Sequence, residues 1–212
     1  MKRDKETKAK LLQSAKAEFM EKGYMNASLR NICRNAGVTT GALYFFFEDK
    51  ADLFRAITKE TIDGIYQIMQ KHYQDEVQMG DNGMSPVQML AEHNQDFQES
   101  AMVIHQMYLH RDEVLLLLTK SQGSGLENIA DKFIEASEKH LAMMAKQMQL
   151  MYPGKVIDKN FIHWLAHMQI DAFIYMITHI EMEEEALIFI RQMVEHMTAG
   201  WCGLFVNEAI RD

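Results

Sequence analysis

The chain of 212 residues is 48% hydrophobic and 25% charged, which is enough apolar sequence for a sizeable core. It contains only 2 Pro and 11 Gly, and helix-forming residues dominate, so we predict an all-α fold with few loops. Its aliphatic runs, such as residues 114–118, are far shorter than the roughly 18 residues that a membrane helix requires, so we expect no membrane partner. No secretory signal is visible and the two cysteines share no metal or redox spacing, which leads us to expect a cytoplasmic protein.

The charge is unevenly distributed along the chain. Residues 1–60 carry 12 Lys and Arg against 8 Asp and Glu, whereas the remaining residues carry 10 against 22. A basic N-terminal segment on an acidic protein is typical of a segment that binds a polyanion, while the acidic remainder of the chain does not contact it. Chance unevenness with a charged, disordered tip is the alternative.

Short, sharply bounded helices are predicted near the N-terminus. Apolar periodicity predicts a first helix over residues 5–22, a second over 29–36 and a third over about 40–45, followed by a long helix from about 49 to 78. Two short helices separated by a Gly-containing turn have helix-turn-helix spacing. In that motif the second helix of the pair enters the major groove of DNA.

The segment from Lys5 to Phe54 resembles the DNA-binding domain of TetR/AcrR-type transcriptional regulators. The stretches AKAEFMEKGYMNASLRNICRNAGV and TTGALYFFFEDKADLF carry the family's Gly-aromatic pair, Ser/Thr cap, Gly-Val turn, third-helix pattern and Lys. The resemblance covers about a quarter of the chain. It implies an all-α protein with an N-terminal three-helix domain over residues 1–50, and a larger helical ligand-binding and dimerisation domain over 51–212, about nine helices in all.

Four aromatic residues in a row, 44–47, cannot all face one core, because only residues three or four apart share a helix face. We expect Leu43 to face inward and Phe47 to fill the junction between the third and fourth helices. The resemblance places Tyr44 and Phe45 where the family contacts the DNA backbone or a thymine methyl. The family usually has Tyr at 45, His at 46 and Thr at 42, so the Phe, Phe and Ala found here remove polar groups.

The remaining contact candidates lie at helix ends. Thr39, Thr40 and Gly41 begin the third helix, where backbone N–H groups and hydroxyls suit phosphates. Lys50 occupies the family's basic position and is expected to pair with phosphate. The predicted DNA-binding residues are Ser28, Arg34, Thr39, Thr40, Gly41, Tyr44, Phe45 and Lys50.

The rest of the chain is predicted to form further helices over about 86–110, 111–120, 125–151, 160–179 and 186–210. The last two are apolar on more than one side, which indicates burial on both faces. We predict a homodimer through a four-helix bundle, as reading a palindrome requires, with a large monomeric core as the alternative. The predicted interface residues are Phe161, Trp164, Leu165, Met168, Ile190, Met193, Met197 and Trp201.

Methionine is abundant in this half of the chain, with 15 of the 18 after residue 60. Flexible, polarizable side chains suit an adaptable apolar pocket, although ordinary core filling explains them equally well. Polar residues among apolar neighbours are candidates to orient a ligand. The predicted pocket residues are His105, His110, Met143, Met144 and Met148.

No catalytic, dinucleotide-binding or Walker motif is present, so we expect no enzyme activity and no cofactor. His163, His167 and Asp171 follow i, i+4, i+8 spacing, which suits a divalent ion. No further ligand is specified, and structural histidines are favoured over a metal site.

Two functions follow from these features. The first is a ligand-responsive transcriptional regulator, by analogy with the family a repressor that binds a palindromic operator as a dimer and is released by a small apolar or amphipathic effector. The second is a helical small-molecule-binding or enzymatic protein with a degenerate DNA-binding domain. Salt-dependent, sequence-specific DNA binding distinguishes the two.

Overall fold

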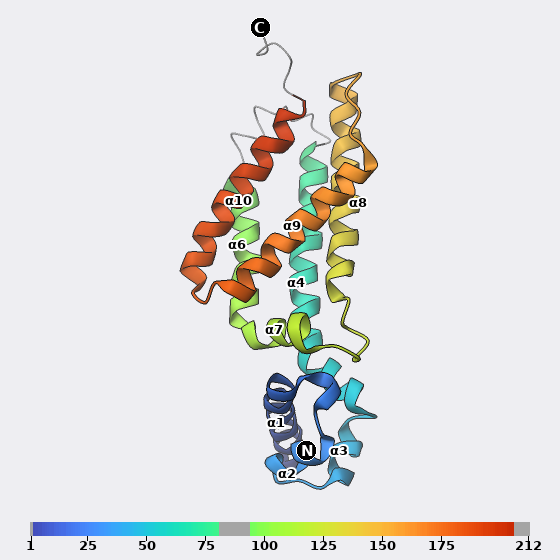
Figure 1. Ribbon diagram of the computed structural model, residues 1–212, viewed down its shortest axis with the longest axis vertical. Coiled ribbons are helices and arrows are strands. Elements are labelled where there is room, and N and C mark those ends of the chain that lie inside the picture. Colours follow the sequence, from blue (N-terminus) through green and yellow to red (C-terminus); the bar gives the residue numbers. More distant parts are fainter. Residues whose placement is uncertain (1, 81–93, 206–212) are drawn as a thin grey trace. The chain divides into compact units, whose positions relative to one another are not determined.

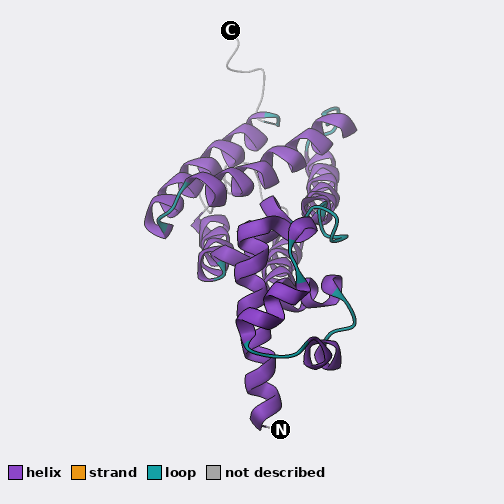
Figure 2. Cartoon of the chain, turned by 60° about the horizontal axis from the view of Figure 1, so that its bottom comes forward, coloured by secondary structure: helices purple, strands orange, loops and turns teal. Residues whose placement is uncertain are grey.

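The computed structural model describes residues 2–80 and 94–205, and within these ranges it is built from nine helices without a strand (Figures 1 and 2). The all-α prediction is confirmed. The predicted helix start at residue 86 lies outside the described residues. The helices are α1 (Lys2–Asn26), α2 (Leu29–Ala36), α3 (Thr40–Phe46), α4 (Lys50–Gly80), α6 (Asn94–Leu109), α7 (Arg111–Lys120), α8 (Ile129–Met151), α9 (Lys159–His179) and α10 (Glu183–Gly203).

The N-terminal helices begin and end at the residues that their sequence signals predict. The Ser28 side chain accepts a hydrogen bond from the Asn31 N–H at the start of α2, and Thr39 accepts one from the Ala42 N–H at the start of α3. Gly37 ends α2 in the left-handed conformation, with φ of 68°, and its N–H bonds to carbonyls of the last turn. These caps fix a short α2 and a short α3 with a tight turn between them.

One predicted helix end is confirmed, and two other predicted boundaries are wrong. At Gly23, φ is 71°, so the helical conformation of α1 is interrupted at the predicted residue, and a short helical segment follows to Asn26. Helix α8 begins at Ile129 rather than 125, because the chain turns through residues 122–128 first. Helix α10 ends at Gly203, since residues 204 and 205 form a turn.

Contacts divide the chain into two compact units, of which the first comprises residues 1–64 and 110–129. Its core is formed by the apolar faces of the N-terminal helices. The rings of Phe19 and Tyr24 both pack edge-on against Phe54, at centroid distances of 5.2 and 5.3 Å. The fully buried side chains here include Leu11, Ala15, Phe19, Ile32, Leu43, Leu53 and Phe54.

Helix α7 belongs to this first unit and packs against α1. The Lys16 ammonium of α1 lies 2.9 Å from an Asp112 carboxylate oxygen and 3.0 Å from one of Glu113, in the first turn of α7. The first packing unit is therefore larger than a three-helix domain. The functional boundary after residue 50 stays a prediction.

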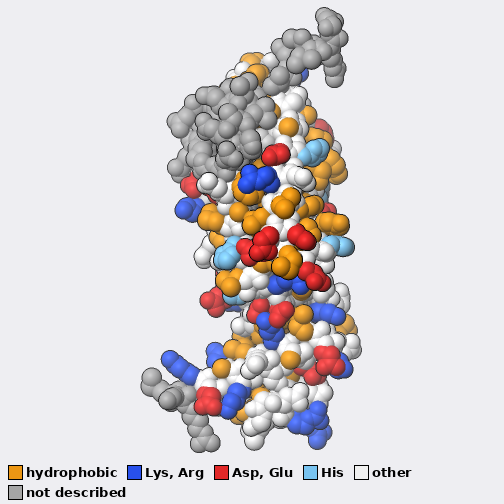
Figure 3. All heavy atoms as spheres, turned by 90° about the vertical axis from the view of Figure 1, so that its left-hand side faces the viewer, with side chains coloured by type: hydrophobic (Ala, Val, Ile, Leu, Met, Phe, Trp, Pro, Cys, Tyr) orange, Lys and Arg blue, Asp and Glu red, His pale blue; other side chains and the backbone are white. Residues whose placement is uncertain are grey.

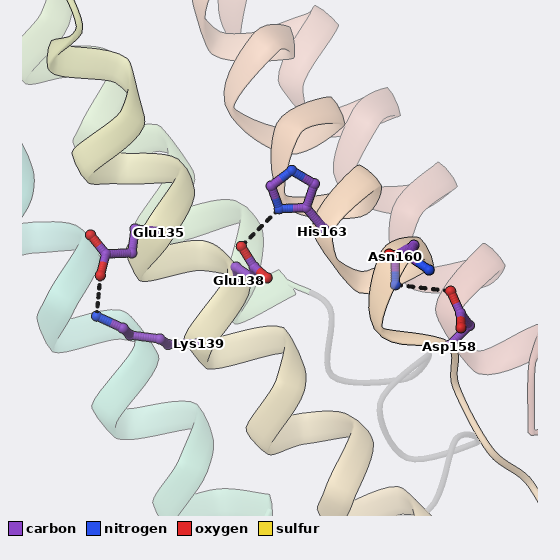
Figure 4. Close-up of polar contacts among 6 residues, drawn as sticks. All are labelled: Glu135, Glu138, Lys139, Asp158, Asn160 and His163. Carbon is purple, nitrogen blue, oxygen red and sulfur yellow. Dashed lines mark hydrogen bonds and ion pairs between the residues drawn. The ribbon is translucent and has the colours of Figure 1, made fainter.

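The second unit comprises residues 65–109 and 130–212. Side chains from α4, α8 and α9 form one of its core clusters, and α10 packs on α6. Asp158 caps α9 by accepting a hydrogen bond from the Asn160 N–H (Figure 4) and another from the Phe161 N–H. The buried members of the cluster are Met69, Tyr73, Ile134, Ala136, Ala166 and Ile170.

Pairs of histidine and glutamate join neighbouring helices of the second unit. His105 of α6 lies 3.0 Å from Glu183 of α10, and His163 of α9 lies 2.9 Å from Glu138 of α8 (Figure 4). His72 of α4 pairs with Glu99 of α6 in the same way. These histidines therefore connect helices within the unit.

Candidate nucleic-acid interface and regulatory sites

The residues of α3 and its C-cap divide between the core and the surface. Leu43 is fully buried and Phe47 nearly so, as predicted, and they attach α3 to the core of the first unit. Tyr44 is 55% exposed and Phe45 is 75% exposed. An outward-facing phenol and phenyl ring on a short helix offer a hydrogen-bond donor and an apolar contact to a partner.

Phe46 supports the exposed ring of Phe45. The two rings meet edge to face with centroids 4.9 Å apart, and Phe46 also lies 6.4 Å from the Phe47 ring. Phe47 in turn has the Lys8 ammonium 5.6 Å from its ring centroid. The rings of residues 45–47 thus lie next to one another in sequence order, from the exposed Phe45 to the buried Phe47.

The other predicted contact residues divide into surface and structural groups. Arg34, Thr40 and Gly41 are exposed, as is Thr39 despite its capping bond. Ser28 is half-buried, and besides capping α2 its backbone N–H donates to the Glu18 carboxylate at 3.1 Å. DNA contact by each of these residues stays a prediction.

Lys50 has a role that sequence reasoning missed. Its ammonium donates to the carbonyl oxygens of Tyr24, Met25 and Ala27 at 2.8, 3.1 and 3.3 Å, and lies 4.6 Å from the Tyr24 ring centroid. An ammonium has three donors, and all three are used here. The last turn of α1 contains no basic residue of its own. The Lys50 ammonium, from α4, therefore supplies the positive charge that stabilises the C-terminal end of α1. A phosphate contact by Lys50 stays a prediction beside this role.

Cys33 is a core residue of the first unit. Burial raises the pKa of its thiol above the ordinary value, although a hydrogen bond with the Thr40 side chain acts in the opposite direction. The thiol therefore remains protonated at neutral pH and is not a reactive group.

The five predicted pocket residues lie in different surroundings, and contact of any of them with a ligand stays a prediction. Met144 and Met148 are buried in the core, and His105 pairs with Glu183. His110 belongs to the first unit, where it precedes α7. Met143 lines a groove of the second unit, which has a volume of about 440 Å³ and lies between α4 and α8. In the sequence, the groove could have been found from aromatic and charged residues that recur at helical spacing, such as Tyr66 and Tyr73 on α4 and Lys132 and Lys139 on α8.

The predicted dimer face is largely at the surface of the chain. Trp164 of α9 is 53% exposed, and most of the other residues are half-buried. Ile190 is an exception, because its side chain is fully buried within the chain and has no surface to offer a second copy. Ile188 of α10 is strongly exposed and was not among the predicted residues. Figure 3, viewed from the side of α6 and α10, shows hydrophobic side chains interspersed with acidic ones on this face.

The three candidate metal ligands on α9 do not form a metal site in the structure. The His163 ring bonds to Glu138 and meets the His167 ring edge-on at 4.7 Å, while Asp171 is exposed. Among the described residues, no cluster of three His, Cys, Asp or Glu side chains has the geometry to hold a metal ion. In the same part of the chain, each helix is too short or too polar to cross a membrane.

The fold and the exposed face of α3 define the chain as a helix-turn-helix protein. Residues 11–57 match the family model described as bacterial regulatory proteins, tetR family. Over 52 residues the chain is 46% identical to the HTH-type transcriptional repressor BepR of Brucella suis and 44% identical to the HTH-type transcriptional regulator AcrR of Shigella flexneri. The N-terminal segment of the chain therefore matches the TetR family of bacterial regulatory proteins.

The similarity in sequence is confined to the N-terminal segment. Each alignment covers 24% of this chain, with 25% of BepR and 24% of AcrR, so the match spans about a quarter of these curated relatives. The similarity in fold extends further. NalD, the secondary repressor of the MexAB-OprM multidrug efflux pump in Pseudomonas aeruginosa, superposes with a TM-score of 0.54 over 91% of this chain and 96% of its own, at 19% identity. A regulator from Aquifex aeolicus gives a TM-score of 0.52 over 91% and 98%, at 20% identity.

Proposed function

We propose that this protein is a ligand-responsive transcriptional repressor that binds a palindromic DNA operator as a homodimer in the cytoplasm. The observation that carries the proposal is the exposed pair Tyr44 and Phe45 on a helix whose buried side matches the family's DNA-binding domain. A phenol donates to phosphate oxygens, and a phenyl ring contacts a thymine methyl. Arg34, Thr39, Thr40 and Gly41 add polar groups and a close backbone approach at the same end of the domain.

The second unit supplies dimerisation and effector binding in this proposal. The apolar faces of α9 and α10, including the exposed Trp164, support a bundle with a second copy. A dimer presents two copies of α3, which read half-sites about 34–36 Å apart or a multiple of that. An effector bound in the second unit favours a conformation whose two α3 helices no longer match that spacing, and the operator is released.

A small apolar or amphipathic effector is supported by two kinds of observation. Methionine is abundant in the second unit. NalD represses a multidrug efflux pump, and FadR of Bacillus subtilis, with a TM-score of 0.50, was solved in complex with stearoyl-CoA. We therefore propose that a small apolar or amphipathic compound binds the second unit and controls DNA binding.

Selection of bound duplexes from a random DNA pool at roughly physiological salt tests this function. An enriched palindrome is expected, and its half-site spacing tests the dimer as well. Absence of enrichment, from protein shown to be folded and free of bound effector, supports the alternative of a small-molecule-binding protein with a degenerate DNA-binding domain. The replacement of polar groups by Phe45 and Phe46, and the internal engagement of Lys50, favour that second candidate.

Tyr44 provides a residue-specific test. Tyr44→Phe removes one hydroxyl from an exposed ring, so we expect about a five- to tenfold loss of operator affinity without loss of stability. The salt dependence of binding is expected to stay the same, because no cation is removed. Fluorescence anisotropy with the selected operator at several salt concentrations measures both quantities. Equal affinity of variant and wild type removes Tyr44 from the contact set.

A further inference from the structure

The groove between α4 and α8 is lined by one face of each helix. From α4 the side chains lie at spacings of three to four residues, starting at Tyr66 and including Tyr73. From α8 they extend from Lys132 to Met143 in the same way. Its volume of about 440 Å³ falls within the roughly 300–1,000 Å³ of small-molecule sites.

Aromatic rings form the buried part of this groove. The imidazole of His140 lies flat on the ring of Tyr73, with centroids 4.1 Å apart and planes 4° from parallel. Both residues are buried, as is Ala136, which leaves room between the helices because its side chain is a single methyl group. Stacked flat rings beside a small residue suit a planar ligand, because aromatic pairs gain from offset stacking beyond the area that they bury.

The charged groups of the groove leave a net positive charge in an acidic unit. Lys139 and Glu135 pair with each other at 2.6 Å (Figure 4), and the ammonium keeps the pKa of the Glu135 carboxyl below its ordinary value. Lys132 is exposed, and its ammonium lies 3.9 Å from the centroid of the Tyr66 ring. In the part of the chain that the structure describes, Lys132 has no carboxylate partner within ion-pair distance.

We propose that this groove is the effector site and that it takes a planar aromatic compound with one anionic group. The ring stacks in the groove beside Tyr73 and His140, and the anion pairs with Lys132. This inference rests on the proposed regulatory function, since it names the class of effector. A cationic compound meets two ammonium groups here, and a plain alkyl chain uses neither the stacked rings nor the charge.

Calorimetric titration of the full chain with two matched probes tests the site. The probes are 1-naphthoate and its neutral analogue 1-naphthalenemethanol, which share the ring and differ in charge. Lys132→Gln is expected to weaken naphthoate binding about tenfold and to leave the neutral analogue unchanged, because only the charge-assisted contact is lost. Lys146→Gln is the control, since Lys146 is exposed on the same helix and does not line the groove.

Two outcomes of the titration overturn the binding site. One is the absence of naphthoate binding to the wild-type protein. The other is equal affinity of Lys132→Gln and wild type for naphthoate. Because Lys132 is exposed, thermal unfolding of the variant is expected to match that of the wild type, and this comparison shows that any loss of binding is local.

A second measurement separates this inference from the proposed function. Operator binding is measured with and without naphthoate, and the probe is expected to reduce the affinity of wild type and of Lys146→Gln but not of Lys132→Gln. Operator binding that ignores naphthoate in all three proteins overturns the assignment of the groove as the effector site. If no operator is bound at all, the regulatory function fails, and the titration without DNA still decides whether the groove binds an aromatic anion.

Discussion

Lys50 shows how one side chain can be assigned to two different partners. Its position in the sequence indicates a phosphate contact, whereas in the folded chain its ammonium bonds to three carbonyl oxygens after the Gly23 kink. Carbonyls at a helix end lack partners within the helix, and a cation there offsets the helix dipole. The structural role accounts for a lysine at this position without any DNA.

Replacing Lys50 therefore tests stability first. Lys50→Ala is expected to lower the free energy of unfolding by about 2 kcal/mol, because three carbonyl groups lose a charged donor. Lys59→Ala, which removes an exposed partner of Asp63 on the same helix, is expected to change it by less than about 0.5 kcal/mol. Urea denaturation followed by circular dichroism measures both. A Lys50→Ala protein with unchanged stability and lost operator affinity would assign the residue mainly to phosphate.

At the scale of elements, α7 is attached to α1 by a charge contact that the sequence did not predict. Lys16 meets Asp112 and Glu113, about a hundred residues further along the chain. Burial alone lowers the pKa of Lys16, but hydrogen bonds and charge from the two carboxylates outweigh it, and the pKa is raised above its ordinary value. A cation with a raised pKa in the folded state stabilises that state below its unfolded pKa, and this stabilisation is lost as the pH rises through the folded pKa.

The contact predicts a pH dependence. Lys16→Met is expected to reduce the free energy of unfolding by about 1 kcal/mol between pH 7 and about 10, and the difference is expected to vanish at higher pH as the lysine of the wild type loses its proton. Lys10→Met, which removes an exposed i,i+4 pair with Glu6, serves as the control. Urea titrations at several pH values provide the curve. A difference that persists undiminished at the highest pH would mean that packing of the lysine stem, rather than its charge, stabilises α7.

The order and type of the elements followed from the sequence to a large extent. Ser28, Gly37 and Thr39 mark the ends of α2 and α3 because capping is a local interaction between neighbours in the chain. The end of α10 and the start of α8 were placed wrongly, since apolar periodicity does not show that turns at residues 122–128 and 204–205 interrupt the helical conformation.

At the scale of the whole molecule, the proposed dimer depends on surface that one chain leaves exposed. Trp164 and Ile188 are large apolar residues at the surface of α9 and α10. Large apolar side chains that a single chain leaves exposed are candidates for an interaction site, which supports the proposed dimer.

Trp164 is the residue with which to test the dimer. Trp164→Glu is expected to shift the protein toward a monomer and to reduce operator affinity by more than tenfold, because a buried charge at the interface has no partner and one half-site is lost. Leu150→Glu, at an exposed position on α8, is the matched control. Light scattering after size-exclusion chromatography gives the oligomeric state. A dimeric Trp164→Glu protein would move the interface away from this face.

The sequence by itself determined the helical class, the helix-turn-helix domain and the outward position of Tyr44 and Phe45. These features depend on periodicity, caps and motif register, which act over a few residues. Only the tertiary structure decided that Lys50 completes the end of α1, that α7 packs with the N-terminal helices, that Ile190 is core rather than interface, and that a groove lies between α4 and α8. Each of these joins residues distant in the chain, and their contacts arise from side-chain packing that no local pattern encodes.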